Sequence, residues 1–339
     1  MAQELVEYES WIDPISELSK VKDAIASHEA FNKYHERIDK NTYKRQRHDL
    51  ILFCQYIREH GIFIDVEDLM HNPMAWNGIT YGLVDDFVKW MTNEGFAIGS
   101  INVRLSTVKV YIKLAVKAGF VKEDELAKVL LVKGYRYKEG KQVDDKREIK
   151  RRGDKKAQPV TLTREQMDLL KQQYPDTPQG RRDTLLMCLL LNHGLRCGEV
   201  ADLTIHNIDL PSRIVTFERE KIEGEQKHRL NHETYLALIR YLEVYQPTGK
   251  LLAGSTRHGK LEGEMSRRAI TKRVQTLGKI ILGIDNLSAH DCRHACVDSM
   301  FRGGTDIKTI QEAGGWTNLA MPMRYAAKAK IANEGVRLG

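Results

Sequence analysis

Cysteine is scarce in this chain, and its distribution does not suggest disulfide bonds. The five cysteines are odd in number, mostly far apart and not preceded by a secretion signal, which predicts reduced thiols in a cytoplasm-like compartment. The acidic N-terminal stretch lacks the apolar segment of a signal peptide. No run approaches the roughly 18 apolar residues that cross a bilayer. We therefore expect neither a disulfide-stabilised secreted protein nor a membrane protein. The cysteines are Cys54, Cys188, Cys197, Cys292 and Cys296.

A metal site is not expected either. Cys292, His294 and Cys296 are close in sequence, but side chains two residues apart on a helix point in different directions. Their spacing on a probable helix spreads them around its circumference. We therefore interpret them as ordinary helical residues.

Positive charge is in excess and concentrated in one segment. The chain carries a net charge of +7 and has a pI of about 9.0, which permits a polyanionic partner such as DNA. Between Lys133 and Lys156 there are eleven lysines and arginines and five acidic residues, a net charge of +6. This segment has no apolar periodicity. It reads as a solvated linker that either simply connects two domains or also lies along phosphates.

Helical periodicity predicts a first domain over residues 21–132, after a loose arm over residues 1–20. Thr42 is expected to cap a helix that ends near Gly61, and Ser100 to cap a helix that ends at Gly119. A further periodic stretch covers Tyr81 to Met91. These patterns predict a bundle of helices.

A second domain is expected over residues 159–339, beyond the basic linker at residues 133–158. Thr163 and Gln166 form a capping box, and the segment from Arg182 to Leu191 is a strongly apolar helix. Two short strands, at 214–219 and 227–230, flank a turn at 223–224. Helices are also expected at 235–245, 266–282, 290–302 and 307–313. The predicted fold is mainly α with a small β hairpin or sheet.

The second domain carries an ordered series of polar motifs. They are Arg196-Cys-Gly-Glu199, then Lys221, then His290-x-x-Arg293, then Gly-Gly-Trp316-Thr-Asn, and finally Tyr325. Any one of them is weak evidence, but the complete series in this order resembles the phage integrase family of tyrosine site-specific recombinases. The overall plan of a helical core-binding domain, a linker and a catalytic domain resembles that family over nearly the whole chain.

The resemblance implies DNA strand transfer with Tyr325 as nucleophile, through a 3′-phosphotyrosine intermediate. A covalent intermediate keeps the energy of the phosphodiester for resealing, and a phenol is a better leaving group than an alkyl alcohol. Arg196 and Arg293 match the pair that would stabilise charge on the phosphate oxygens. No Asp/Glu cluster is placed to hold magnesium, so the reaction should need no metal, no ATP and no other cofactor.

The resemblance also assigns the remaining catalytic roles. Lys221 is the expected general acid for the departing 5′ oxygen, with Lys227 across the turn as the alternative. His290 lies on the same helix face as Arg293 and would accept the phenol proton or bond the phosphate. Trp316 replaces the histidine of many relatives and can donate one N–H but transfer no proton. Glu199 is expected to orient a catalytic side chain. His294 is expected to point elsewhere.

DNA contacts are harder to identify. Arg268 matches a base-contacting position of the family pattern, and arginine can read guanine in the major groove. Ser266 opens the same helix, and Ser288 is a candidate donor to the phosphate. In the first domain the candidate backbone contacts, each equally consistent with a solvated surface, are Lys44, Arg45, Arg47, Arg104 and Lys109.

The expected partner is double-stranded DNA with inverted-repeat half-sites, clamped between the two domains in a cytoplasmic, nucleoid-associated setting. The resemblance implies a homotetramer on DNA, with a monomer or weak dimer off it, and a C-terminal tail that packs on a neighbouring subunit. Two alternatives stay open. One is a topoisomerase or telomere resolvase with the same chemistry, and the other is a DNA-binding regulator that keeps the fold without cleaving.

Overall fold

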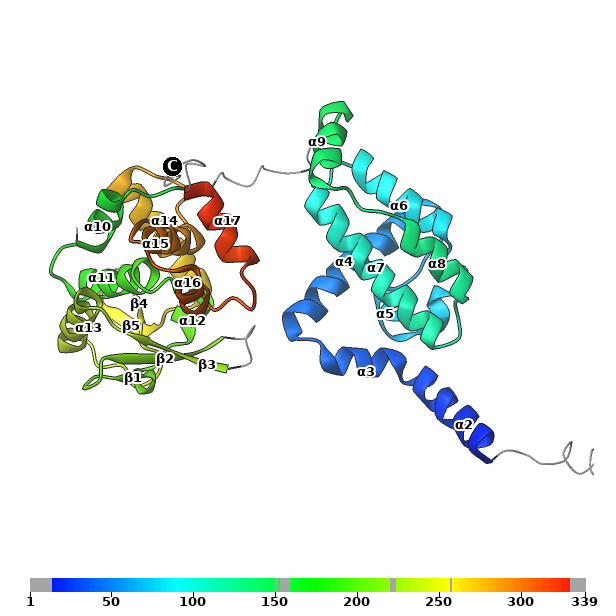
Figure 1. The fold of residues 1–339 in the computed structure, drawn as a ribbon, viewed down its shortest axis with the longest axis horizontal. Helices are drawn as coiled ribbons and strands as arrows, with labels where there is room; N and C mark the ends of the chain where they lie inside the picture. The colour runs from blue at the N-terminus through cyan, green and yellow to red at the C-terminus, as the bar shows by residue number, and fades with distance from the viewer. Residues whose placement is uncertain are drawn as a thin grey trace, which may run out of the picture. The chain divides into compact units, whose positions relative to one another are not determined.

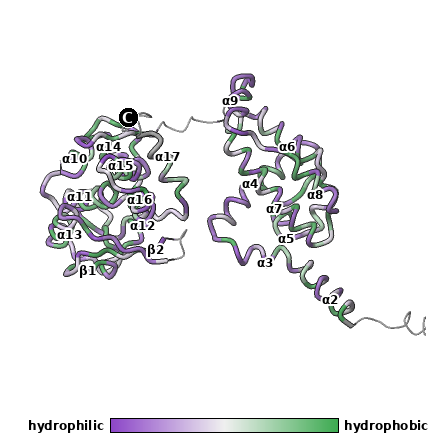
Figure 2. Tube along the Cα trace, in the orientation of Figure 1, coloured by the Kyte–Doolittle hydropathy of each residue, from purple (hydrophilic) through white to green (hydrophobic). Residues whose placement is uncertain are grey.

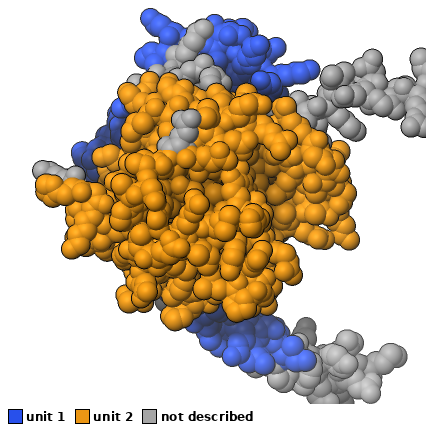
Figure 3. Space-filling model, turned by 90° about the vertical axis from the view of Figure 1, so that its left-hand side faces the viewer, with its two compact units in different colours: residues 1–156 blue, residues 157–339 orange. Residues whose placement is uncertain are grey.

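The computed structural model describes residues 14–149, 152, 159–172, 174–219, 224–256 and 258–329. The chain forms two compact units, residues 1–156 (unit 1) and residues 157–339 (unit 2), which Figure 3 colours separately. Helices dominate both units, and short antiparallel strands occur in unit 2 (Figure 1). The expected fold class, mainly α with a little sheet, is confirmed. Among the described helices, none is long and apolar enough to cross a membrane.

Unit 1 is a bundle of helices around one aromatic-rich core. The rings of Phe53 and Tyr111 stack on either side of Trp76, at centroid distances of 6.1 and 5.8 Å. Hydrophobic and hydrophilic segments alternate along the helices, as expected for helices that bury one face (Figure 2). The helices are α2 (Pro14–His28), α3 (Ala30–Arg37), α4 (Lys40–Glu59), α5 (Val66–His71), the 3-10 helix η1 (Pro73–Trp76), α6 (Tyr81–Asn93), α7 (Ile98–Lys117), α8 (Glu123–Leu131) and α9 (Tyr137–Lys146).

Several helix starts in unit 1 differ from the sequence prediction. Asp39, not Thr42, caps α4, because its carboxylate accepts the backbone N–H of Asn41 and Thr42 at 2.8 and 2.9 Å. Helix α7 begins at Ile98 without a side-chain cap, so Ser100 lies inside it. Helix α2 begins at Pro14, within the segment expected to be a loose arm. Local capping signals were thus overridden by residues a few positions upstream.

Much of the expected linker belongs to unit 1. Helix α9 lies within it, and the Arg147 guanidinium donates to the carbonyls of Thr92 and Phe96 at 3.2 and 2.8 Å. The backbone N–H of Arg152 donates to the carbonyl of Gly95 at 2.6 Å. Only one residue of α9, a glycine, is buried, so the helix leaves no apolar period in the sequence. Residues 150–151 and 153–158 of the expected linker lie outside the described residues.

Unit 2 is built around the buried helix α11. Its neighbours are α10, α13 and α15, and the capping box of Thr163 and Gln166 at the start of α10 is present as predicted. The helices are α10 (Arg164–Gln172), α11 (Pro178–Leu191), α12 (Cys197–Asp202), the 3-10 helix η2 (Ile205–Asn207), α13 (His232–Val244), α14 (Arg267–Leu282), α15 (Ala289–Arg302), α16 (Ile307–Gly314) and α17 (Ala320–Ala329).

The strands of unit 2 form two small antiparallel sheets. One has the order β1-β2-β3 and the other is the β4–β5 pair. The predicted strand at 214–219 is confirmed, but its partner begins at Gly224 rather than Lys227, and Thr216 pairs with Lys227. Gly224, expected in the turn, therefore belongs to β3, and Glu223 lies outside the described residues. The strands are β1 (Ile208–Asp209), β2 (Ile214–Arg219), β3 (Gly224–Arg229), β4 (Ala253–Ser255) and β5 (Leu261–Glu264).

Candidate active site

Five of the predicted catalytic residues converge within unit 2, although they come from four separate parts of its chain. Glu199 lies in α12 and Arg196 directly before it, Arg293 lies in α15, Trp316 follows α16, and Tyr325 lies in α17. Helices α15, α16 and α17 pack against one another. Arg293 also donates to the carbonyl of Gly194, so the segment before α12 meets α15 to α17 in one site, although their residues lie up to more than a hundred positions apart.

Arg196 is held at the rim of the site by a carboxylate. Its Nη1 donates to Oε1 of Glu199 at 2.7 Å, and its backbone N–H donates to Oε2 of the same side chain at 2.8 Å. The Glu199 side chain is nearly buried, whereas a third of the Arg196 side chain is exposed. Arg196 therefore keeps N–H groups available to an incoming anion while Glu199 fixes its orientation.

Arg293 lies deeper and is fixed by backbone carbonyls. Its two Nη atoms donate to the carbonyls of Gly194 and Gly314, and its Cζ lies 4.9 Å from the Trp316 ring centroid. Gly194 has a φ of +59°, a conformation that glycine adopts without strain. Burial lowers the pKa of Arg293, and the neighbouring Arg196 lowers it further. The guanidinium nevertheless stays charged at neutral pH.

Tyr325 packs in a small apolar cluster beside these arginines. It contacts the buried side chains of Val297 and Ile310, and its ring centroid lies 5.8 Å from that of Trp316. Burial raises the pKa of Tyr325, although Arg293 and Arg196 oppose the shift. The phenol is therefore protonated at neutral pH, and its use as a nucleophile requires a proton acceptor.

The histidines are arranged differently from the sequence expectation. His294 does not point elsewhere, because its ring centroid lies 4.8 Å from that of Tyr325. His290 is one turn earlier on α15, with its ring centroid 4.3 Å from that of His294. The expectation for His294 was wrong because α15 turns this residue toward α17. The imidazole next to the candidate nucleophile is thus that of His294.

Arg219 is a member of the site that sequence reasoning missed. It ends β2, its side chain has no exposed area, and its Nε lies 3.3 Å from Oε1 of Glu199. The strand pattern offered one signal, because Arg219 occupies the buried phase of β2 after Val215 and Phe217. An arginine at a buried position of a strand is unusual, because charged side chains are seldom fully buried.

The sequence offered two candidates for the general acid, Lys221 and Lys227. Lys221 lies outside the described residues, two positions after the end of β2. The alternative, Lys227, is exposed on β3 opposite Thr216.

The serines predicted to contact DNA serve as helix caps. Ser266 Oγ accepts the backbone N–H of Ala269 at the start of α14, and Ser288 Oγ both donates to the Asp291 carboxylate and accepts its backbone N–H. Arg268, in the first turn of α14, is exposed. Of the predicted contacts in unit 2, Ser266 is exposed as well, whereas Ser288 is only partly exposed.

The candidate contacts in unit 1 fall into two groups. Lys44 and Arg45 are exposed on α4, whereas Lys109 Nζ donates to the carbonyls of Leu130 and Val132 at 3.2 and 2.5 Å. Lys109 therefore caps the end of α8. The three candidate arginines lie beside carboxylates. Arg45 bonds Asp49, Arg104 lies near the same Asp49, and Arg47 bonds Glu67.

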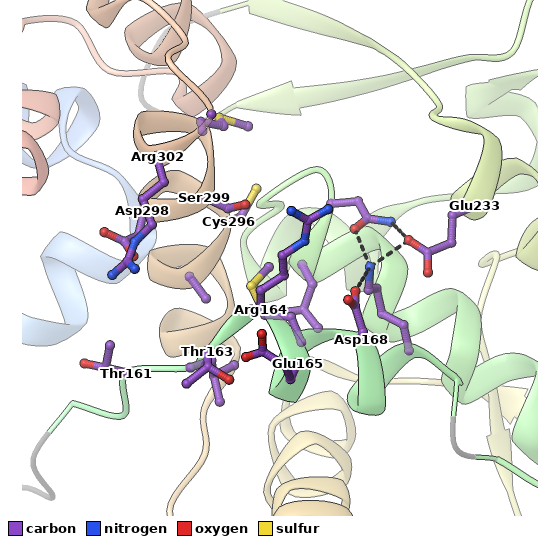
Figure 4. Close-up of a pocket in the computed structure, with 18 of the residues that line it drawn as sticks. Thr161, Thr163, Arg164, Glu165, Asp168, Glu233, Cys296, Asp298, Ser299 and Arg302 are labelled. Atoms are coloured by element: carbon purple, nitrogen blue, oxygen red, sulfur yellow. Dashed lines mark hydrogen bonds and ion pairs between the residues drawn. The ribbon is translucent and has the colours of Figure 1, made fainter. Parts of the chain in front are cut away.

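Two hollows of unit 2 differ in their relation to the site. A cavity of about 390 Å³ is lined by Arg196, Glu199 and residues of β2. A larger cavity of about 800 Å³ lies between α10, the end of α11 and the end of α15, where Lys171 bonds Glu233 (Figure 4). None of the predicted site residues lines the larger cavity. Among the described residues, no group of three or more His, Cys, Asp or Glu side chains is placed to hold a metal ion.

Known proteins show the family of this chain and share its fold. Residues 160–331 match the model of the phage integrase family. The chain is 24% identical over 312 residues to a tyrosine recombinase XerC of Actinobacillus succinogenes, covering 90% of this chain and 92% of the relative. Among solved structures, the Tn1549 transposon integrase in complex with transposon right end DNA is similar, with a TM-score of 0.60 at 15% identity over 88% of this chain and 94% of the integrase. A lambda integrase tetramer bound to a Holliday junction has a TM-score of 0.58 at 16% identity, over 87% of this chain and 74% of the integrase. These structures share the fold.

Proposed function

This chain belongs to the phage integrase family, and from that membership we propose that it is a site-specific recombinase that breaks and rejoins DNA through Tyr325. The observation that carries the proposal is the convergence of Tyr325 with Arg196 and Arg293 in unit 2. A buried phenol beside two guanidinium groups suits attack on a phosphodiester, because the cations stabilise charge that develops at phosphorus.

The chemistry follows from the groups in the site. The Tyr325 oxygen attacks phosphorus while the bond to the 5′ oxygen breaks, which leaves a 3′-phosphotyrosine and a free 5′ hydroxyl. The phenol proton passes to the imidazole pair, where His294 lies against Tyr325 and His290 against His294. Lys221 supplies the proton that the departing 5′ oxygen takes up. A 5′ hydroxyl of the partner duplex later attacks the phosphotyrosine and restores the phenol.

The reaction requires no metal or ATP in this scheme, because arginines supply the positive charge and the phosphotyrosine conserves the phosphodiester. The substrate is double-stranded DNA with two inverted half-sites, each bound by one protomer. Four protomers pair two sites and exchange strands. Support for the assembly comes from the fold shared with a lambda integrase tetramer bound to a Holliday junction.

A covalent-adduct assay tests this proposal. Labelled duplexes from both flanks of the protein's own gene are incubated with the protein in EDTA and separated on a denaturing gel. We expect an SDS-resistant adduct with the wild type and none with Tyr325→Phe, which should bind the same duplexes equally well. Tight binding without any adduct would instead favour a DNA-binding regulator. An adduct that persists in Tyr325→Phe would assign the nucleophile to another residue.

A further inference from the structure

Arg219 occupies a position that strand geometry reserves for an apolar side chain. Residues of β2 alternate between buried and exposed, and Val215, Phe217 and Arg219 share the buried phase. The guanidinium lies 5.1 Å from the Phe217 ring centroid. A cation in this phase is uncommon because burial removes it from water.

Two parts of the active site meet at the Arg219 side chain. On one side, Nε lies 3.3 Å from the same Glu199 oxygen that accepts a hydrogen bond from Arg196. On the other side lies Gly315, where a Cβ would fall 2.0 Å from the Arg219 Nη1. Gly315 has a φ of +57° and ends α16 just before Trp316. The guanidinium thus packs directly on the turn that carries the indole.

The contacts of Arg219 do not account for its presence on grounds of stability. Within the described residues, none of its three side-chain nitrogens has a hydrogen-bond acceptor. Burial, with the positive charges of Arg293 and Arg196 nearby, lowers the pKa of Arg219 to about 10. A methionine of similar length would fill the same space without a desolvated charge.

We propose that Arg219 is a positioning residue of the strand-transfer site, which holds Glu199, and through it Arg196, in register with the Gly315 turn that presents Trp316. The inference rests on the proposed function. Three guanidinium groups and one carboxylate leave this cluster a net charge of +2, which matches the two negative charges of a pentavalent phosphate in the transition state.

The same side chain links the β2–β3 hairpin to the segment that carries the nucleophile. Gln226 on β3 donates to the carbonyl of Glu312 near the end of α16, so the hairpin touches this helix at a second point. Lys221, the candidate general acid, follows Arg219 by two residues in the sequence and lies outside the described residues.

The test compares two buried arginines of unit 2. Arg219→Met removes the charge, Arg219→Lys keeps it, and Arg182→Met is the matched control. Arg182 is equally buried but bonds Asp183 and the carbonyl of Ala253. For each variant one measures the urea midpoint of the full chain, the Kd for a flanking duplex on which the wild type forms an adduct, and the adduct rate at saturating protein.

We expect Arg219→Met to unfold at the same or a higher urea concentration than the wild type, with an unchanged Kd and an adduct rate lower by about 10- to 100-fold. Arg219→Lys should recover part of that rate. Arg182→Met should lower the urea midpoint clearly and change the adduct rate of the folded protein little.

Three results would overturn the inference. An unchanged adduct rate in Arg219→Met, or a lysine variant no faster than the methionine variant, would remove the role of the charge. A clearly lower urea midpoint would make Arg219 an ordinary stabilising residue. If the wild type itself forms no adduct, the proposed function fails and the inference falls with it, whereas a wild-type adduct with unchanged Arg219 variants rejects the inference alone.

Discussion

Unit 2 contains two clusters in which arginines surround one carboxylate. The clusters differ in whether the N–H groups of their arginines have hydrogen-bond acceptors. In the first, between α11 and α14, the fully buried Asp183 bonds Arg182 through one oxygen and Arg273 through the other. In the second, Glu199 faces Arg196 and Arg219. In the first cluster each side-chain nitrogen of Arg182 has a hydrogen-bond acceptor, whereas in the second the described residues provide none for the side-chain nitrogens of Arg219.

The difference shows that a buried arginine can have either of two roles. A guanidinium whose donors all meet acceptors holds the fold together, since removing its partner leaves a buried charge. A guanidinium that stays short of acceptors lowers stability, and its retention indicates a ligand or a role in positioning. Burial alone does not separate these cases, because Arg182 and Arg219 are both 1% exposed.

The largest expected effect is a loss of folding stability in a variant of the first cluster. Asp183→Asn should lower the free energy of unfolding by about 3–5 kcal/mol, because it leaves the buried Arg182 without a counter-charge. Urea unfolding of the full chain measures it. The control is Asp202→Asn, whose ion pairs with Lys250 and Arg267 are largely exposed and should contribute less than about 1 kcal/mol. Equal effects of the two variants would contradict the role given to the buried cluster.

A substitution in the second cluster should change the rate of adduct formation rather than the free energy of unfolding. Arg196→Met should reduce the adduct rate by about 100-fold or more, because it removes a donor to the transition state. Its urea midpoint should stay near that of the wild type, since a third of the Arg196 side chain is already exposed. Arg302→Met removes an exposed arginine paired with Asp298 and serves as the control. A matching fall in rate in that control would show that the loss is general.

The pKa of a histidine beside Arg219 offers a third test of the difference between the two clusters. Burial, followed by the positive charge of Arg219, lowers the pKa of His228 to about 4. Replacing Arg219 by methionine should therefore raise the His228 pKa, which NMR titration measures. The pKa of His193 is lowered to about 4 by burial and by His228. An unchanged His228 pKa in Arg219→Met would contradict the placement of the guanidinium.

The same histidines predict acid sensitivity. Both have a folded-state pKa below the usual 6.5, so the unfolded chain binds protons that the folded chain does not. The free energy of unfolding should have its full value above pH 6.5. It should decrease as the pH is lowered from 6.5 to about 4. Urea midpoints at pH 7 and pH 5 test this, with His193→Gln as a variant in which the fall should be smaller. A midpoint that does not change with pH would contradict the burial of these rings.

The smallest effect concerns unit 1 and non-specific DNA binding. Lys44 is exposed, whereas Lys109 caps the end of α8. If Lys44 contacts a phosphate, Lys44→Gln should reduce the slope of log Kd against log salt by about 1. Lys109→Gln should leave that slope unchanged. Fluorescence anisotropy with a random-sequence duplex measures both, and a larger change for Lys109 would reverse the assignment.

The sequence by itself determined the fold class and the order of the motifs. Apolar periodicity placed α4, α7 and α11, because each buries one continuous face or, in α11, nearly its whole length. The series from Arg196 to Tyr325 predicted five of the residues that converge in unit 2, but not Arg219 or the place of His294. Capping signals were less reliable, as Asp39 and Thr42 show, because two residues near one helix end can both serve as caps.

Only the tertiary structure decided how the site is assembled. It turned His294 toward Tyr325 and committed Lys109 to backbone carbonyls, neither of which leaves a trace in local sequence. It also placed Arg219 against Glu199 and Gly315, which lie 20 and 96 positions away in the chain. The physical reason is that a pattern along the chain reports which face of an element is buried, whereas the partners of a charge depend on which elements pack against that face.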